Sequence, residues 1–181
     1  NLVYTNPPET QKCIKFAYFG VINDFQKSFR SIFVIDKLLS NSGLAVQLDL
    51  YGHIEFNKFD VTRSKVVNYL GSIDHKDVFN KTQEYNFLVI LHTDEASSLE
   101  PIPGKFFDYL QARRPILCVM SKRSYISQFI ALNGLGLVVD PLEISQFNFK
   151  YALDNFKFNS EFDISAYSRT NQFNKYITLL S

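Results

Sequence analysis

The stretch between positions 100 and 119 is the part of the sequence that most restricts the fold. Pro101 and Pro103 keep the chain out of helical geometry before position 104. Beyond them, apolar residues recur with the spacing of one buried helical face: Phe106, Phe107, Tyr109, Leu110 and Ala112. Pro115 ends this helix, and residues 116–120 are apolar without a break. A strand with no polar alternation is covered on both faces, which is typical of a parallel sheet between helices.

Strand and helix patterns alternate along the rest of the chain. We expect strands at residues 14–19, 45–51, 65–70, 87–91, 116–120 and 137–139. We expect helices at residues 25–40, 104–112, 124–132 and 164–180, and another after Asp74, which can cap it; residues 142–162 are expected to be partly helical. This alternation predicts an α/β fold, a Rossmann-like three-layer α/β/α sandwich with a parallel sheet of about six strands.

The carboxyl edge of such a sheet is where ligands bind. The segments expected at that edge include Gly20, Gly52 with His53, and residues 71–73 and 92–103. The helix that begins with Gly104 and Lys105 starts at the same edge. Backbone N–H groups at a helix start have no partner inside the helix and can donate hydrogen bonds to a phosphate. Lys105 adds a positive charge in the first turn. The sequence therefore predicts an anion site at this helix start.

Two carboxylates flank the predicted anion site. Glu100 precedes the helix, and Asp108 lies eight residues further along, one turn inside it. Each has an ordinary alternative, because acids in loops and on helices are commonly solvated. Lys27 lies near the start of the first expected helix, and it can likewise be an ordinary solvated residue. Arg113 and Arg114 follow the helix, and we interpret them as charges that complement its negative end rather than as an anion site.

The same stretch resembles the second half of a GT-B glycosyltransferase, the Rossmann-like domain that holds the nucleotide-sugar donor. Enzymes of the retaining, group 1 type carry two acidic residues with seven between them, which Glu100 and Asp108 match with Asp in place of the second Glu. The runs Pro-Gly-Lys-Phe-Phe-Asp-Tyr-Leu and Arg-Pro-Ile-Leu are similar to the family's Pro-Gly-Lys-hydrophobic-Glu-Tyr and Gly-Arg-Pro-Ile segments. The resemblance extends from Cys13 to the end and covers one of the two domains of a full enzyme.

The resemblance implies a role for each candidate site residue. The diphosphate would be held by Gly20, Lys27, Gly104 and Lys105. Asp108 would accept hydrogen bonds from the ribose hydroxyls, since two carboxylate oxygens suit a vicinal diol. Glu100 would be the catalytic residue near the transferred sugar, and Ile73 would lie against the nucleobase. No metal and no other cofactor is implied, because the nucleoside diphosphate sugar is itself the substrate.

The implied function is hexosyl transfer from a nucleoside diphosphate sugar to an acceptor, in surface polysaccharide biosynthesis. Residues 1–12 would then be a linker from a missing N-terminal acceptor domain, and residues 13–181 the nucleotide-sugar-binding domain, which we expect to be inactive alone. The resemblance also implies a cytoplasmic location. Peripheral association of the full enzyme with the inner face of the membrane is one setting that it suggests.

Two departures from the family pattern keep other functions open. Val21 stands where many relatives have Arg, and Asp108 is shorter than the usual Glu. The alternatives are a nucleotide-sugar epimerase-like domain and a non-catalytic α/β interaction module with a decayed nucleotide site. The net charge of +1 gives no argument for a nucleic-acid partner. Cys13 and Cys118 are predicted to be free thiols, because Cys118 falls in an expected core strand.

Overall fold

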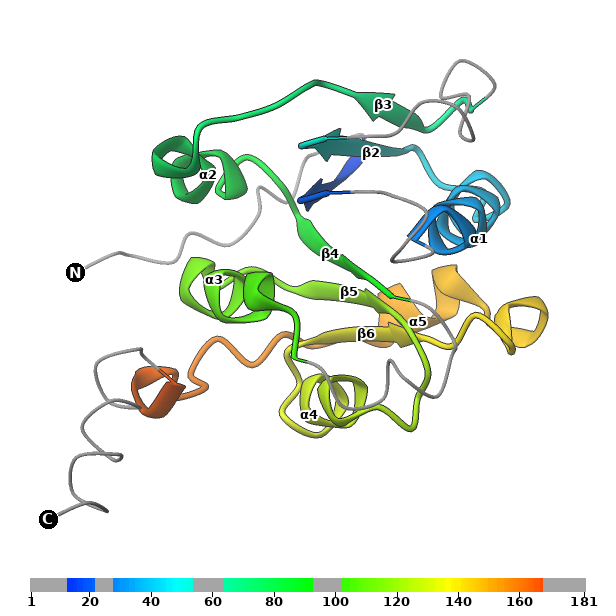
Figure 1. Ribbon diagram of the computed structural model, residues 1–181. Coiled ribbons are helices and arrows are strands. Elements are labelled where there is room, and N and C mark those ends of the chain that lie inside the picture. Colours follow the sequence, from blue (N-terminus) through cyan, green and yellow to red (C-terminus); the bar gives the residue numbers. More distant parts are fainter. Residues whose placement is uncertain (1–12, 22–27, 54–63, 93–101, 168–181) are drawn as a thin grey trace, which may run out of the picture.

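The computed structural model describes residues 13–21, 28–53, 64–92 and 102–167, which build an α/β sandwich (Figure 1). The strands are β1 (Ile14–Phe19), β2 (Val46–Tyr51), β3 (Val67–Tyr69), β4 (Phe87–Leu91), β5 (Ile116–Val119) and β6 (Gly136–Val139). The α-helices are α1 (Ser28–Ser40), α2 (His75–Thr82), α3 (Gly104–Ala112), α4 (Tyr125–Leu132) and α5 (Phe149–Asn155). Two short 3-10 helices, η3 (Ile144–Gln146) and η4 (Ser165–Tyr167), complete the described part.

The six strands form one parallel sheet in the order β3-β2-β1-β4-β5-β6. The chain adds β2 and β3 on one side of β1, and then β4, β5 and β6 on the other side. The direction in which strands are added therefore reverses between β1 and β4. In open α/β sheets the crevice outside the carboxyl ends of the strands at such a reversal is the usual place for a ligand. The sequence expectation of a Rossmann-like sheet of six parallel strands is confirmed.

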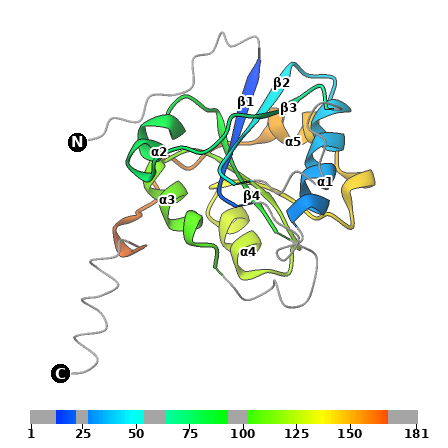
Figure 2. The same ribbon diagram turned by 45° about the horizontal axis from the view of Figure 1, so that its top comes forward.

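Helices cover both faces of the sheet (Figures 1 and 2). Side chains of α1, η3 and α5 pack on one face, in a core around Phe16, Leu48 and Val89. Side chains of α2, α3 and α4 pack on the other, around Ala17 and Leu88. Residues that alternate along one strand therefore enter two different cores, and β4 is buried at all of its positions. This explains why its sequence is a continuous apolar run.

Pairing continues past the carboxyl ends of the first three strands. The amide of Gly20 donates to the Tyr51 carbonyl at 2.9 Å, and the amide of Gly52 donates to the Gly71 carbonyl at 2.9 Å. The Tyr69 hydroxyl also donates to the Gly52 carbonyl at 2.9 Å. The edge expected to bind ligand is therefore an ordered row of backbone with a glycine after each of these strands.

Two local expectations need correction, and two others fall outside the described residues. Asp74 stands at the N-cap of α2, but its side chain makes no capping bond there and pairs instead with Lys76 at 3.3 Å. Arg114 does not complement its own helix, because its guanidinium donates at 2.9 Å to the carbonyl of Gln83, the residue that caps the end of α2. Arg113 does stand at the C-cap of α3, as expected, and its guanidinium donates to the Ser160 carbonyl. Most of the expected helix at 164–180, and the expected linker at 1–12, lie outside the described residues.

Two further observations concern the cysteine thiols and the lengths of the helices. Cys13 and Cys118 are both free, and Cys118 is fully buried in β5. Among the described residues, no helix has the length and apolar character needed to cross a bilayer.

Gly136 offers a direct test of the sheet. A Cβ added there would overlap the backbone carbonyl of Ile116 on β5. We expect Gly136→Ala to lower the free energy of unfolding by about 2 kcal/mol, because the β5–β6 pairing would have to open. Gly104→Ala is the matched control, since nothing lies within 4 Å of a Cβ at that position. Urea denaturation should show the control unchanged or slightly more stable; equal stability of the two variants would contradict this register.

Candidate functional site

A cavity of about 400 Å³ opens at the carboxyl ends of β1 and β2, between α2 and α3. The strand ends contribute Phe19, Gly20, Val21, Tyr51, Gly52 and His53. The segment before α2 and that helix contribute Ile73, His75, Val78, Phe79 and Thr82. Helix α3 contributes Lys105, Asp108, Tyr109 and Gln111. The cavity thus combines an apolar and aromatic interior with charged groups on one helix, which is the usual make-up of a small-molecule site.

Two glycines allow the close backbone approach that forms one edge of the cavity. Gly52 has a φ of +123°, and a Cβ there would overlap the carbonyl group of Gly20. Gly20 has a φ of +151°, and a Cβ there would lie 2.7 Å from the Nζ of Lys105. Larger residues at these positions would be strained and would displace their neighbours. The glycines therefore let the ammonium group of Lys105 sit directly against the end of β1.

Lys105 points back over the sheet rather than into bulk solvent. Its Nζ lies 3.7 Å from the centroid of the Tyr18 ring, in the geometry of a cation–π contact. The Tyr18 hydroxyl donates to the Val21 carbonyl at 3.0 Å, which fixes that ring below the lysine. Burial lowers the pKa of Lys105 to about 7. Burial also lowers the pKa of His92, and the charge of Lys105 adds to that effect, so the two groups compete for positive charge.

Asp108 lies one helical turn beyond Lys105 and lines the same cavity. The position of α3 that presents both side chains is fixed by Tyr109, whose hydroxyl oxygen accepts a hydrogen bond from the Phe19 amide at 3.1 Å. Tyr109 is fully buried, and burial raises its pKa, so the hydroxyl stays neutral. A cation and a carboxylate are thereby held on one face of α3 beside the end of β1.

An aromatic cluster, which we define as Phe19, Tyr51, Tyr85 and Tyr109, supports the inner wall of the cavity; Phe19, Tyr51 and Tyr109 line the cavity, and Tyr85 packs behind them. Phe19 and Tyr51 stack face to face, with ring centroids 4.9 Å apart and planes 7° apart. Tyr85 and Tyr109 meet Phe19 edge-on, at 6.3 Å and 6.5 Å. Such contacts restrict the rings to one arrangement.

Comparison with solved structures identifies this architecture. A lipopolysaccharide outer core galactosyltransferase, WaaB, matches 96% of the chain with a TM-score of 0.70 at 16% identity. HepE from Anabaena, solved in complex with UDP and glucose, matches 80% with a TM-score of 0.58 at 14% identity. The C-terminal domain of LpcC, a glycosyl transferase group 1 family protein from Francisella tularensis, matches 90% with a TM-score of 0.53 at 13% identity.

The chain has the fold of one GT-B domain. It spans 50% of the WaaB chain and 40% of the HepE chain, but 86% of the separate LpcC domain. By sequence, it matches no protein-family model and no curated protein. The likeness to solved structures therefore identifies the fold, and the activity has to be argued from the site.

The GT-B domain brings four of the predicted site residues to one cavity: Gly20, Ile73, Lys105 and Asp108. Gly104 is the first residue of α3 and is exposed, but it does not line the cavity. Glu100 and Lys27 lie outside the described residues. The ligand groups assigned to all seven residues stay predictions.

Several cavity residues were not found from the sequence. Gln111 follows Asp108 by three positions and shares its helical face, so the helical period carried a signal for it. Val78 and Phe79 gave the ordinary signal of a helix core, and Tyr51 that of a strand end. These residues line one cavity with Lys105 only because β2, α2 and α3 converge in space.

A second hollow, of about 530 Å³, lies between the end of α1 and the segment from η3 to α5. It is lined by polar side chains such as Asn41 and Gln146. The end of α1 leads into the start of β2, so this hollow lies toward the amino ends of the strands, opposite to the edge where parallel sheets bind ligands. Within the described ranges, no group of three or more His, Cys, Asp or Glu side chains is placed to hold a metal ion.

The lowered pKa of Lys105 makes the stability of the domain depend on pH. The pKa falls from 10.5 in the unfolded chain to about 7 in the fold, so protonation favours unfolding. The cost is absent above about pH 10.5, grows as the pH falls and is complete below about pH 7. We expect Lys105→Met to stabilise the domain more at pH 6.5 than at pH 9.5, by at most about 1.4 kcal/mol for each pH unit.

Urea denaturation at the two pH values measures this difference. Lys150→Met is the control, because Lys150 is an exposed lysine that pairs with Asp154 on α5. The control should change stability by a similar amount at both pH values. A Lys105→Met effect that is independent of pH would show that the ammonium group is not desolvated.

Proposed function

We propose that this GT-B domain binds the nucleoside diphosphate sugar of a glycosyltransferase. The proposal is carried by one observation: Lys105 and Asp108 line a single cavity from one face of α3, beside the glycine at the end of β1. The cavity combines a site for anions, a carboxylate for hydroxyl groups and an apolar wall for a flat base. A nucleoside diphosphate carries these three groups in that order.

The diphosphate is assigned to the start of α3. Lys105 supplies a cation, and the first amides of α3 add the positive end of the helix dipole. Pro103 at the N-cap makes no side-chain capping bond, so its own side chain does not compete there with a phosphate. Gly20 and Gly104 leave room for close approach, and Lys27 would add a second cation. A desolvated ammonium that meets a diphosphate regains a counter-charge where water is excluded, which strengthens the attraction.

The nucleoside is assigned to the space between α3 and α2. The Asp108 carboxylate accepts hydrogen bonds from the two ribose hydroxyls. The base then lies against Ile73 and the apolar side chains of α2, Val78 and Phe79. These side chains are apolar and give the base a surface to bury.

The whole enzyme would transfer a hexosyl group from this donor to an acceptor held by another domain. Stabilisation of the leaving diphosphate by Lys105 and the helix dipole would lower the barrier, because charge develops there in the transition state. Glu100 is assigned a place near the sugar, and with Asp108 it supports the retaining, group 1 type. The names of WaaB and of WaaG, a second structurally similar protein described as a glycosyltransferase involved in lipopolysaccharide biosynthesis, support a role in surface polysaccharide assembly. We place the enzyme in the cytoplasm, with peripheral membrane association of the full protein.

Calorimetric titration of the chain with UDP, GDP and ADP tests the proposal. We expect one of them to bind, and Lys105→Met to weaken its binding about tenfold or more, the effect of losing one charge-assisted hydrogen bond. Asp108→Asn should weaken binding about fivefold, since one acceptor oxygen becomes a donor. Lys150→Met, on the far face, should bind as the unaltered chain does. The absence of binding by all three nucleotides at millimolar concentration would favour the non-catalytic interaction module instead.

A further inference from the structure

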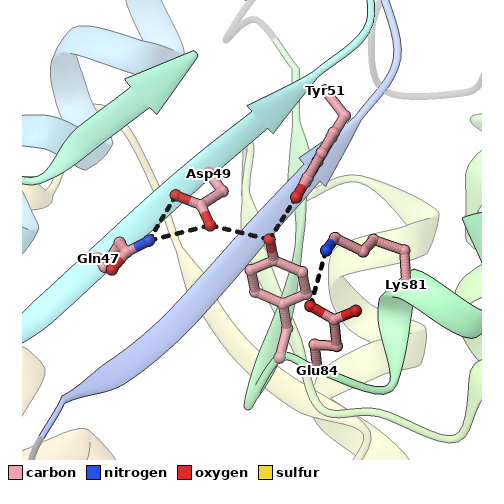
Figure 3. A network of polar contacts seen from close by, with 6 residues as sticks. Gln47, Asp49, Tyr51, Lys81 and Glu84 are labelled. Atoms are coloured by element: carbon pink, nitrogen blue, oxygen red, sulfur yellow. Dashed lines mark hydrogen bonds and ion pairs between the residues drawn. The ribbon is translucent and has the colours of Figure 1, made fainter. Parts of the chain in front are cut away.

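We propose that Asp49, which does not line the cavity, is a positioning residue for nucleoside binding, because it fixes the Tyr51 side chain through the hydroxyl of Tyr85. The inference rests on the proposed function for its ligand. It rests on separate observations for its geometry, since neither Asp49 nor Tyr85 lines the cavity. Figure 3 shows Asp49 and Tyr51 in the network of polar contacts.

Asp49 is a carboxylate inside the sheet, with 4% of its surface exposed. Its oxygens accept hydrogen bonds from the Gln47 amide at 2.8 and 3.0 Å and from the Asn68 amide at 3.0 Å. The Tyr85 hydroxyl donates to the second oxygen at 2.8 Å. These donors are all uncharged. A carboxylate kept in this environment costs stability relative to an apolar residue of similar size, so a role beyond packing is expected.

The hydrogen bonds have a fixed direction. The Tyr85 hydroxyl has one proton, and that proton is donated to Asp49. Its oxygen can therefore only accept from the Tyr51 hydroxyl, which lies 2.8 Å away. Burial raises the pKa of Tyr85, and its bonds to Tyr51 and Asp49 add to that rise, so the bridging hydroxyl stays protonated. The order from the sheet to the cavity is Asp49, Tyr85, Tyr51, with each tyrosine donating toward the carboxylate.

The last member of this chain of hydrogen bonds belongs to the cavity wall. Tyr51 stacks on Phe19, and both rings line the cavity. Tyr85 meets the Tyr51 ring edge-on, at 6.3 Å and 80°, so the hydroxyl bond and the ring contact restrain the same side chain. Tyr51 cannot turn toward the cavity without breaking both. The wall beside the nucleoside is therefore held by a polar anchor within the sheet.

The Tyr51 hydroxyl also lies near a charged pair at the end of α2. Lys81, at the end of α2, pairs with Glu84 at 2.8 Å (Figure 3). The pKa of Lys81 is raised chiefly by Glu84, and the Tyr51 hydroxyl contributes to the rise. Because Tyr51 donates its own proton to Tyr85, its oxygen is available to accept from the lysine.

The test compares two ligands that reach different parts of the cavity. One is the nucleotide among UDP, GDP and ADP that the unaltered chain binds best, and the other is inorganic pyrophosphate. We expect Tyr85→Phe and Asp49→Leu to weaken binding of the nucleotide about tenfold and to leave pyrophosphate unchanged. Lys105→Met should weaken both. Asp49→Asn should bind the nucleotide within about threefold of the unaltered chain, because its amide oxygen still accepts from Tyr85.

Tyr151→Phe, at an exposed tyrosine of α5, is the control for loss of a hydroxyl and should bind as the unaltered chain does. If Asp49→Leu fails to fold, the contrast between Tyr85→Phe and Asp49→Asn decides. Folded variants that bind the nucleotide normally would overturn the positioning role alone. Equal losses for nucleotide and pyrophosphate would also overturn it, because a general structural role predicts them. An unaltered chain that binds pyrophosphate but no nucleotide, or neither ligand, would overturn the proposed function as well.

Discussion

The contact between the end of β1 and the first two turns of α3 is the interaction on which the site depends. Tyr18 places its ring under the ammonium of Lys105, and the Phe19 amide is bound by the hydroxyl of Tyr109. Consecutive residues of one strand thus hold two side chains of one helix. The arrangement keeps a cation partly out of water at a helix start, where the dipole is also positive. Without a ligand, this combination does not stabilise the domain. A bound diphosphate would be attracted by both positive groups.

The rest of the fold supports this contact from two directions. The strand order puts β1 at the centre of the sheet, so its carboxyl end is flanked by β2 on one side and β4 on the other. Backbone pairing at Gly20 and Gly52 makes the strand ends rigid at the point where a ligand would approach. On the other side of the cavity, the aromatic cluster and the bonds to Asp49 hold the wall beside α2. The charged and the apolar parts of the cavity therefore have separate supports, and substitutions can affect them separately.

The sequence predicted the sheet well because its strands are buried on both faces, and continuous apolar runs such as β4 and β5 are hard to misread. Lys105 was found because it lies in the first turn of a predicted helix, and Asp108 because it follows Glu100 by eight positions; the sequence displays both features directly. Asp49 was not found. It occupies an alternating position of β2 that reads as a polar face, but α2 and Tyr85 cover that face in the fold. The bond between Asp49 and Tyr85 joins residues 36 positions apart, and no local pattern predicts such a pairing.

The most direct measurement of the central claim is the pKa of Lys105 itself, followed by the NMR chemical shift of its side-chain carbon next to Nζ. In the free chain we predict a midpoint near pH 7, because burial removes the ammonium from water. With a saturating nucleoside diphosphate the midpoint should rise by about two pH units or more, because the phosphates restore a counter-charge. A midpoint near 10.5 in the free chain, or one that the nucleotide leaves unchanged, would contradict the account.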